Sequence, residues 1–212
     1  IDMNKNIHII VQARLESSRL HEKVLKTIHN KTILRILLDR LKKSKFKDEI
    51  IVAIPNNKRN LPLKKILLGI NFIKIFEGSL DNVLSRYYHA ADKYGSDIII
   101  RITADCPLID SDLLDSMISK FLKSDLDYLS NTIEPTFPDG FDIEIFNFKT
   151  LEHAFRYARK STDKEHVTPY IKRNKKKFKI QNFKNSIDLS NLRLTIDEKT
   201  DYEFIKKLTS LM

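Results

Sequence analysis

The chain has 212 residues, of which 42% are hydrophobic and 31% charged, with a formal net charge of +10. This composition excludes a disordered chain, and no apolar stretch reaches the roughly 20 residues of a membrane-spanning helix. The charge alone fits a nucleic-acid-binding protein, an enzyme of polyanionic small molecules or a lysine-rich proteome. Because no segment has the pattern of a secretory signal and the one cysteine can form no internal disulfide, we expect a cytoplasmic protein. We expect a single domain over residues 3–212 and leave Ile1 and Asp2, which precede Met3, out of the reasoning.

Short apolar runs rich in β-branched residues predict strands in the first half of the chain. They cover residues 7–11, 50–54, 71–76 and 97–103. Near-continuous apolar runs are typical of strands that are covered on both faces, which favours a mostly parallel sheet.

Amphipathic patterns between these runs predict helices over residues 32–44, 79–95 and 111–121. Ser79 is a candidate N-cap of the second helix and Gly95 its stop signal, while Asp110 or Ser111 caps the third. The alternation of strands and helices predicts an α/β fold with a mostly parallel sheet sandwiched by helices.

The pattern changes after residue 130. Residues 131–140 contain two prolines and a glycine and predict a loop, which leads into an alternating strand over residues 141–148. Two helical patterns (150–159 and 165–173), a basic stretch, a strand over residues 192–196 and a last helix follow. We interpret residues 131–190 as a small subdomain inserted on the main sheet.

Charged residues follow three of the predicted strands, at the positions where an open parallel sheet binds its ligands. Arg14, Arg19 and Lys23 follow the first strand, Asp105 follows the fourth, and Asp197 follows the last. Since Mg²⁺ is usually held by one or two carboxylates and by phosphate oxygens, this set predicts a site for a nucleoside triphosphate with magnesium. The loop has neither GxxxxGK[ST] nor GxGxxG, so backbone amides and basic side chains would be its phosphate donors.

Each of these residues also has a structural interpretation. The three cations could be solvated surface charges, and the two aspartates could cap a turn or the last helix. Cys106 suggests a nucleophile, but transfer of a nucleotidyl group to a hydroxyl needs no covalent intermediate, which favours a small buried cysteine.

The basic run over residues 172–184 has lysines interleaved with Phe178 and Phe183, as in proteins that bind nucleic acids. Phe178, Ile180 and Phe183 equally fit the buried side of one strand, which would leave the lysines in solvent. We favour this second interpretation and predict no nucleic-acid partner.

Six motifs in order along the chain carry a family resemblance: "QARLESSRLHEKVL", "EGSLDNVLSRYYHAA", "RITADCPLID", "FPDGFDIEIF", "EHVTPYI" and "LRLTIDEKTDYEFI". Together they resemble the cytidylyltransferases that activate acidic or unusual sugars, a group with the CMP-Kdo and CMP-acylneuraminate synthetases. The spore-coat polysaccharide biosynthesis branch is the most similar. The resemblance implies a Rossmann-like nucleotidyltransferase fold, CTP and Mg²⁺ as co-substrates, a CMP-sugar and pyrophosphate as products, a role in surface polysaccharide or glycan biosynthesis, and a homodimer.

The resemblance also implies roles for individual residues. Arg14, Lys23 and Asp105 would be catalytic, and Asp105 and Asp197 would hold the metal. The nucleotide would contact Gln12, Ala13, Arg14, Arg19, Lys23, Gly78, Arg86 and Thr103. Residues 131–190 would be a sugar-side insertion or a dimerisation subdomain, with the sugar near Asp139, Asp142, Glu144, Glu165 and His166. A polar sheet face for Asp142 and Glu144, a structural role for His166 and a simple strand-to-helix turn at Gly78 are the alternatives.

Two departures from the family pattern fall in the first motif. The frequent glycine before the serines is Glu16, and the Pro-Gly before the lysine is His21-Glu22. Either the two carboxylates point away from the phosphates or they lower the affinity for the triphosphate. They leave open a nucleotidyltransferase for another nucleotide or a sugar phosphate, and a nucleotide- or nucleic-acid-binding module without catalysis.

Overall fold

The computed structural model describes residues 5–211, so residues 3, 4 and 212 of the expected domain lie outside the described residues. Within residues 5–211, seven strands form one sheet in the order β5-β4-β1-β6-β8-β7-β9, and β2 pairs with β3 in a separate hairpin. The strands are β1 (Ile7–Gln12), β2 (Thr27–Ile28), β3 (Lys31–Thr32), β4 (Glu49–Pro55), β5 (Lys74–Gly78), β6 (Ile98–Thr103), β7 (Tyr128–Ser130), β8 (Glu144–Asn147) and β9 (Ile180–Asn182). Only β8 runs antiparallel to both its neighbours in this sheet, as far as the described residues go, so the mostly parallel sheet is confirmed.

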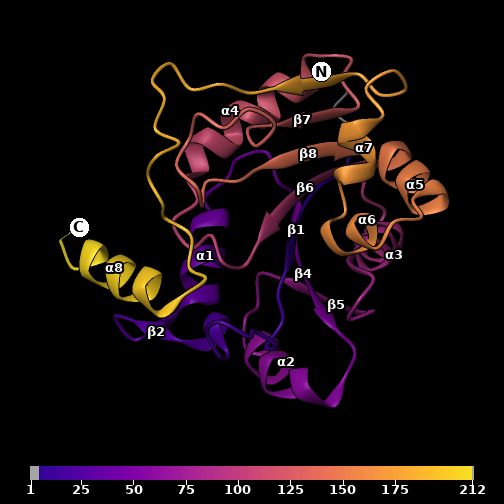
Figure 1. The fold of residues 1–212 in the computed structure, drawn as a ribbon. Coiled ribbons are helices and arrows are strands. Elements are labelled where there is room, and N and C mark those ends of the chain that lie inside the picture. The colour runs from indigo at the N-terminus through magenta and orange to yellow at the C-terminus, as the bar shows by residue number, and fades with distance from the viewer. Residues whose placement is uncertain (1–4, 212) are drawn as a thin grey trace.

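Helices cover both faces of the sheet (Figure 1), as the alternating pattern predicted. They are α1 (Ile33–Leu41), α2 (Leu61–Leu68), α3 (Val83–Tyr94), α4 (Ser111–Leu122), α5 (Phe148–Tyr157), α6 (Ser161–His166), α7 (Pro169–Arg173) and α8 (Lys199–Thr209), with short 3₁₀ helices η1 (Lys23–Leu25) and η2 (Lys58–Asn60). Helices α1, α2 and α4 pack on one face, and α3, α5 and α7 pack on the other. None of the helices described in residues 5–211 combines the length and apolarity needed to span a membrane.

The central strands are largely apolar because both of their faces are buried, and His8 in β1 and Arg101 in β6 interrupt the apolar runs. In β1, Ile9 and Val11 belong to the core under α1, α2 and α4, while Ile10 belongs to the core under α3, α5 and α7. Successive side chains of a strand point to opposite faces, so each face of the sheet receives an aliphatic layer from one short run. This packing on both faces fixes the position of the carboxyl end of β1. The loop that follows β1 at this end carries the candidate site described below.

Several predicted boundaries differ from the structure. Helix α3 begins at Val83 with Asn82 as its N-cap, not Ser79, because the Asn82 side chain accepts the hydrogen bond from the Ser85 amide. The strand expected over residues 71–76 is β5 at Lys74–Gly78, and α2 had no counterpart among the predicted helices. Residues 131–190 contribute β8 and β9 to the main sheet and α5, α6 and α7 to its surroundings.

The helix expected over residues 165–173 is interrupted. Helix α6 ends at His166, and Val167 has φ 69° and ψ −55°, which places it in a γ-turn closed by a 2.8 Å hydrogen bond from the Thr168 amide to the His166 carbonyl. Pro169 then starts α7. Because proline has no N–H to donate, the helical hydrogen-bond ladder cannot run through this position.

The basic run divides its aromatic residues between the two faces of the sheet. Phe178 and Ile180 pack with the core under α3, α5 and α7, whereas Phe183 packs against the opposite core. The prediction that all three line the buried side of one strand is therefore wrong for Phe183, which is an odd number of residues from the other two.

The predicted strand over residues 192–196 is also wrong. This segment is extended, but its ladder is a single parallel bridge between Arg193 and Asp139, flanked by a hydrogen bond from the Leu194 amide to the Asp139 carbonyl. Its partner is a loop, so no regular strand can form. Gly140 makes the close approach possible, because a Cβ there would lie 2.6 Å from the backbone of Leu194 and Thr195.

We predict that Gly140→Ala destabilises the protein by about 2–4 kcal/mol, since the residue has φ +107° and no room for a methyl group. Urea unfolding followed by circular dichroism would measure the change. Gly69→Ala is the matched control, because its Cβ would meet only the Ile66 carbonyl at 3.4 Å, and it should change stability by less than about 0.5 kcal/mol. Equal effects of the two substitutions would contradict this explanation.

We predict that Glu22→Gly stabilises the protein by about 1 kcal/mol. Glu22 replaces the glycine of the family motif and has φ 48° and ψ 35°, a left-handed conformation that costs roughly 1–2 kcal/mol for a residue with a side chain. Glu22→Ala keeps a side chain in the left-handed conformation, and His21→Gly changes a residue that does not have this conformation. Neither variant should therefore raise the unfolding midpoint. A Glu22→Gly variant that is less stable than the Glu22→Ala variant would show that Glu22 is not strained.

Candidate active site

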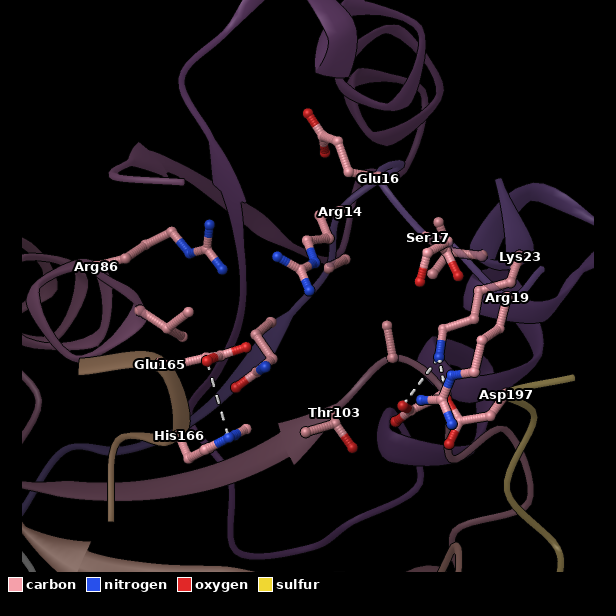
Figure 2. A pocket seen from close by; sticks show the side chains of 17 residues that line it. Arg14, Glu16, Ser17, Arg19, Lys23, Arg86, Thr103, Glu165, His166 and Asp197 are labelled. Carbon is pink, nitrogen blue, oxygen red and sulfur yellow. Dashed lines mark hydrogen bonds and ion pairs between the residues drawn. The ribbon is translucent and has the colours of Figure 1, made fainter. Parts of the chain in front are cut away.

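The loop between β1 and η1 is held in place by η2. The Leu15 amide donates to Asn60 Oδ1 at 2.9 Å, and the Glu16 carboxylate accepts hydrogen bonds from the side-chain amides of Asn57 and Asn60 at 2.9–3.0 Å. Burial opposes ionisation of Glu16, but these hydrogen bonds outweigh it and lower its pKa. Figure 2 shows Glu16 pointing away from Lys23 and Asp197. Glu16 thus fixes the loop to η2, and Glu22 lines a separate hollow of the same loop together with Glu16 and Arg59.

Lys23 joins the two aspartates that were predicted to hold a metal. Its Nζ lies 3.1 Å from Asp105 Oδ2 and 2.7 Å from Asp197 Oδ1 (Figure 2). Burial opposes the charge of Asp105, but the Lys23 ammonium and hydrogen bonds outweigh this effect and lower its pKa. Asp105 therefore remains ionised beside this cation, and the prediction that the fold brings the two aspartates together is correct.

Asp105 also positions the segment that carries Asp197. The Asp105 carbonyl accepts hydrogen bonds from the Ile196 amide at 2.8 Å and from Thr195 Oγ1 at 3.1 Å. Glu198, not Asp197, is the N-cap of α8, which leaves the Asp197 carboxylate free for the site. Hydrogen bonds to the Asp105 carbonyl, and not the pairing of two strands, thus bring Asp105 and Asp197 together.

A cavity of about 320 Å³ extends from these aspartates along the loop. Its walls include nearly all residues predicted to bind the nucleotide: Gln12, Ala13, Arg14, Arg19, Lys23, Arg86 and Thr103. Glu16, Ser17 and Ser18 of the first motif also line it, as do Glu165 and His166, which the resemblance placed on the sugar side.

Arg14 and Arg86 bring two guanidinium groups to this cavity. Their guanidinium groups both point into the space at the centre of Figure 2, and among the residues of the described range neither has a carboxylate within 4.0 Å. Burial lowers the pKa of Arg86 to about 10, and the neighbouring Arg14 acts in the same direction, whereas Tyr87 and Glu16 oppose the shift. Two guanidinium groups without a counter-ion in a cavity are suited to bind an anion.

Gly78 does not line the cavity, but its lack of a side chain makes room for Arg86, which does. A Cβ at this position would lie 2.9 Å from the Phe76 ring and 3.1 Å from Cγ of Arg86. The glycine therefore allows the Arg86 side chain to cross the end of β5.

A second cavity of about 250 Å³ adjoins the first, and Thr103 lines both. Its other walls are all polar: Arg101, Thr132, Asp142, Glu144 and Lys172. The side chain of Glu144 accepts hydrogen bonds from Arg101, from Tyr128 Oη and from Thr168 Oγ1 at 2.6 Å, and it forms an ion pair with Lys172 at 3.1 Å. This polar cavity is of a size and chemistry that suit a hydroxylated ligand.

Glu144 is not on an exposed polar face, as the alternating pattern of residues 141–148 had suggested. It is 3% exposed, because α7 covers this face of the sheet and provides Thr168 and Lys172 as partners. Burial opposes its charge, but Arg101, Lys172 and the two hydroxyl donors hold its pKa at about 2.

The other predicted sugar-side residues lie in different places. Asp142 lines the second cavity, and Asp139 lies outside both cavities, where it forms an ion pair with Arg193. The exposed side chains of Glu165 and His166 reach the first cavity from the end of α6 (Figure 2). Cys106 is buried, and burial raises its pKa well above its usual value, which favours the structural interpretation of this cysteine.

Sequence reasoning missed Arg101, Thr132 and Lys172 as walls of the second cavity. Lys172 was hidden in the basic run that was taken for a solvated face. Lys172 lies in α7, four residues after Thr168 at the N-cap of this helix, and this spacing, which brings two side chains to the same side, was the available signal. The only sign of Arg101 in the sequence was its position as a charged residue inside an apolar strand, because a buried cation requires a buried partner.

Comparisons with known proteins agree with this geometry. The family model described as cytidylyltransferase matches residues 8–212. The spore coat polysaccharide biosynthesis protein SpsF of Bacillus subtilis is 32% identical over 212 residues, covering 96% of this chain and 86% of that protein.

Two solved structures share the fold. A cytidylyltransferase from Leptospira borgpetersenii superposes with a TM-score of 0.94 at 38% identity, covering 99% of this chain and 88% of that one. CMP:2-keto-3-deoxy-manno-octonic acid synthetase, solved with CTP, superposes with a TM-score of 0.75 at 15% identity, covering 98% of this chain and 99% of that one. The resemblance drawn from the six motifs is confirmed: the chain belongs to the cytidylyltransferase family of CTP-dependent nucleotidyltransferases.

Proposed function

We propose that this enzyme transfers CMP from CTP to a hydroxyl group of an acidic or unusual sugar and releases pyrophosphate, for surface polysaccharide or glycan biosynthesis. The observation that carries the proposal is the cavity that joins the cations of the 12–25 loop to the pair Asp105 and Asp197. The second, entirely polar cavity supplies a place for the acceptor. The relatives named for spore-coat polysaccharide and for a CMP-sugar synthetase support the same acceptor class.

The two aspartates fit Mg²⁺ when the nucleotide supplies further ligands. They offer hard carboxylate oxygens that already converge on one cation, the Lys23 ammonium. No group of three or more His, Cys, Asp or Glu in the described part of the chain could hold a metal alone. Magnesium commonly binds through one or two carboxylates and substrate phosphates, so we propose Asp105 and Asp197 as its protein ligands. The bound ion would neutralise phosphate charge and help to lower the pKa of the attacking hydroxyl.

The chain itself contributes mainly positioning and charge. Loop amides, Arg14, Arg19 and Lys23 would bind the triphosphate in the first cavity, and the acceptor would lie in the second. Since Thr103 lines both, the acceptor hydroxyl can reach the α-phosphorus near this residue, opposite the leaving pyrophosphate. Holding two reactants in this arrangement, with cations around the phosphates, accounts for phosphoryl-transfer catalysis without a strong general base.

Asp142 is suited to accept a hydrogen bond from the acceptor. It lines the second cavity, and no cation of the described chain lies within 4.0 Å of its carboxylate. Burial raises its pKa to about 6, and the charges of Asp139, Glu144 and Asp105 act in the same direction. In the folded protein the Asp142 carboxylate is therefore partly buried without a cation beside it. Such a carboxylate is typical of a residue that binds a ligand.

We predict that Asp142→Asn stabilises the free enzyme at pH 8 but not at pH 3. A carboxyl whose pKa is higher in the folded state loses stability as the pH rises from its unfolded value of 3.8 to about 6. The full penalty, about 3 kcal/mol, is present above that range and is absent from the asparagine variant. Urea unfolding at several pH values, in buffer with a chelator, measures it, with the exposed Asp92→Asn as control. A stabilisation that does not depend on pH would contradict the raised pKa.

We predict pyrophosphate release when the enzyme is incubated with CTP, Mg²⁺ and a suitable acid sugar from a panel. Other nucleotides and sugar phosphates in the panel separate the alternative substrates. Asp105→Asn should lower turnover at least about 100-fold, while Asp112→Asn, an exposed carboxylate on α4, should leave it unchanged. The proposal fails if no sugar gives pyrophosphate and CTP with Mg²⁺ gives no thermal stabilisation. Near-normal turnover of Asp105→Asn would remove this residue from the site.

A further inference from the structure

We propose that Lys23 occupies the metal position of the nucleotide-free enzyme, so that the divalent cation binds strongly only together with the nucleotide that draws this lysine away. This inference rests on the proposed metal-dependent function. It assigns Lys23 a second role besides phosphate binding: the ammonium group excludes the metal until substrate is present.

The contacts of Lys23 are those of a bridging cation. Its ammonium is within 3.1 Å of one oxygen from each aspartate, and its side chain is only 16% exposed. The carboxylates of Asp105 and Asp197 are 27% and 19% exposed, so the three charges form a partly buried cluster. In such surroundings charges interact more strongly than they do in water.

Other cations contact only Asp197. Arg19 lies 3.4 Å from Asp197 Oδ1 with a side chain that is 60% exposed. Arg193 lies 3.4 Å from Asp197 Oδ2 and is mainly engaged with Asp139 and Asp201. Within residues 5–211, Lys23 is therefore the one cation that bridges both carboxylates.

A lysine and a divalent ion cannot share this position. Two neighbouring carboxylates repel each other unless a cation lies between them, and the ammonium already serves this purpose. A metal that entered would displace the ammonium and would meet its charge at short range. The free enzyme therefore binds the metal weakly, because binding requires Lys23 to lose both ion pairs.

The triphosphate offers Lys23 another partner. Lys23 lines the same cavity as Ser17, Ser18 and Arg14, where the phosphates are proposed to lie. Phosphate oxygens can accept its hydrogen bonds and simultaneously provide ligands to the metal. Nucleotide and metal thus favour each other's binding, and by linkage the coupling is equal in both directions.

Binding of Mn²⁺, as a paramagnetic substitute for Mg²⁺, tests this inference without turnover. Free Mn²⁺ would be measured by electron paramagnetic resonance with the full chain and no nucleotide. Lys23→Gln, whose amide can still donate hydrogen bonds, should bind Mn²⁺ at least about tenfold more tightly than the wild type. Adding Asp105→Asn to Lys23→Gln should abolish this gain, which places the ion at the carboxylates.

Two control variants separate the bridge from net charge. Arg19→Gln removes a cation that contacts only Asp197, and Lys26→Gln removes one whose ammonium lies over the Tyr202 ring instead. Neither should change Mn²⁺ affinity more than about threefold. The thermal midpoint is a second readout: Mn²⁺ alone should raise it clearly for Lys23→Gln and only slightly for the wild type.

The inference is overturned if Lys23→Gln binds Mn²⁺ no more tightly than the wild type, or if Arg19→Gln shows the same gain. The proposed function is tested separately in the wild type, with a CTP analogue that has a methylene bridge between the α- and β-phosphorus atoms. A rise in Mn²⁺ affinity of at least about tenfold with this analogue is expected. The absence of any rise would count against the nucleotide and metal site, whatever the Lys23 variant shows.

Discussion

The convergence of Lys23, Asp105 and Asp197 is the interaction on which the rest of the site depends. The three residues come from η1, from the end of β6 and from the segment before α8. Ionised carboxylates repel at this distance unless a cation joins them. The ammonium therefore joins the segments around the first cavity, and it also fixes the end of the loop that follows β1.

The second cavity, where we propose that the acceptor binds, is built on a different electrostatic principle. Glu144 is buried and fully satisfied by Arg101, Tyr128, Thr168 and Lys172, so it organises the polar cavity but is not free to change partners. Removing one member of such a network leaves an unpaired charge in the interior. The loss of stability is then larger than the net stability that the intact network contributes. The γ-turn at Val167 places Thr168 at this network and Glu165 and His166 at the first cavity, so one short motif contributes to both cavities.

The main sheet and the cationic loop could be predicted because they depend on local patterns. Apolar runs that are covered on both faces marked β1, β4 and β6, and charges at strand ends marked Lys23 and Asp105. Residues 192–196 were mistaken for a strand because an apolar run carries no information on whether its partner is a strand or a loop. The burial of Glu144 could not be predicted, since it depends on α7 folding back over β8. The role of Glu16 could not be predicted either, because its carboxylate is bound by Asn57 and Asn60, which are distant in the sequence.

A crystal structure with Mg²⁺ and the methylene-bridged CTP analogue is the most direct test of how the charges are arranged. The triphosphate should lie along residues 13–23, with the metal between Asp105 and Asp197 and the Lys23 ammonium moved from the carboxylates to phosphate oxygens. The acceptor cavity beside Thr103 should stay open toward the α-phosphorus. A nucleotide bound elsewhere, or one bound here with Lys23 still bridging both aspartates and no metal between them, would contradict this description of the site.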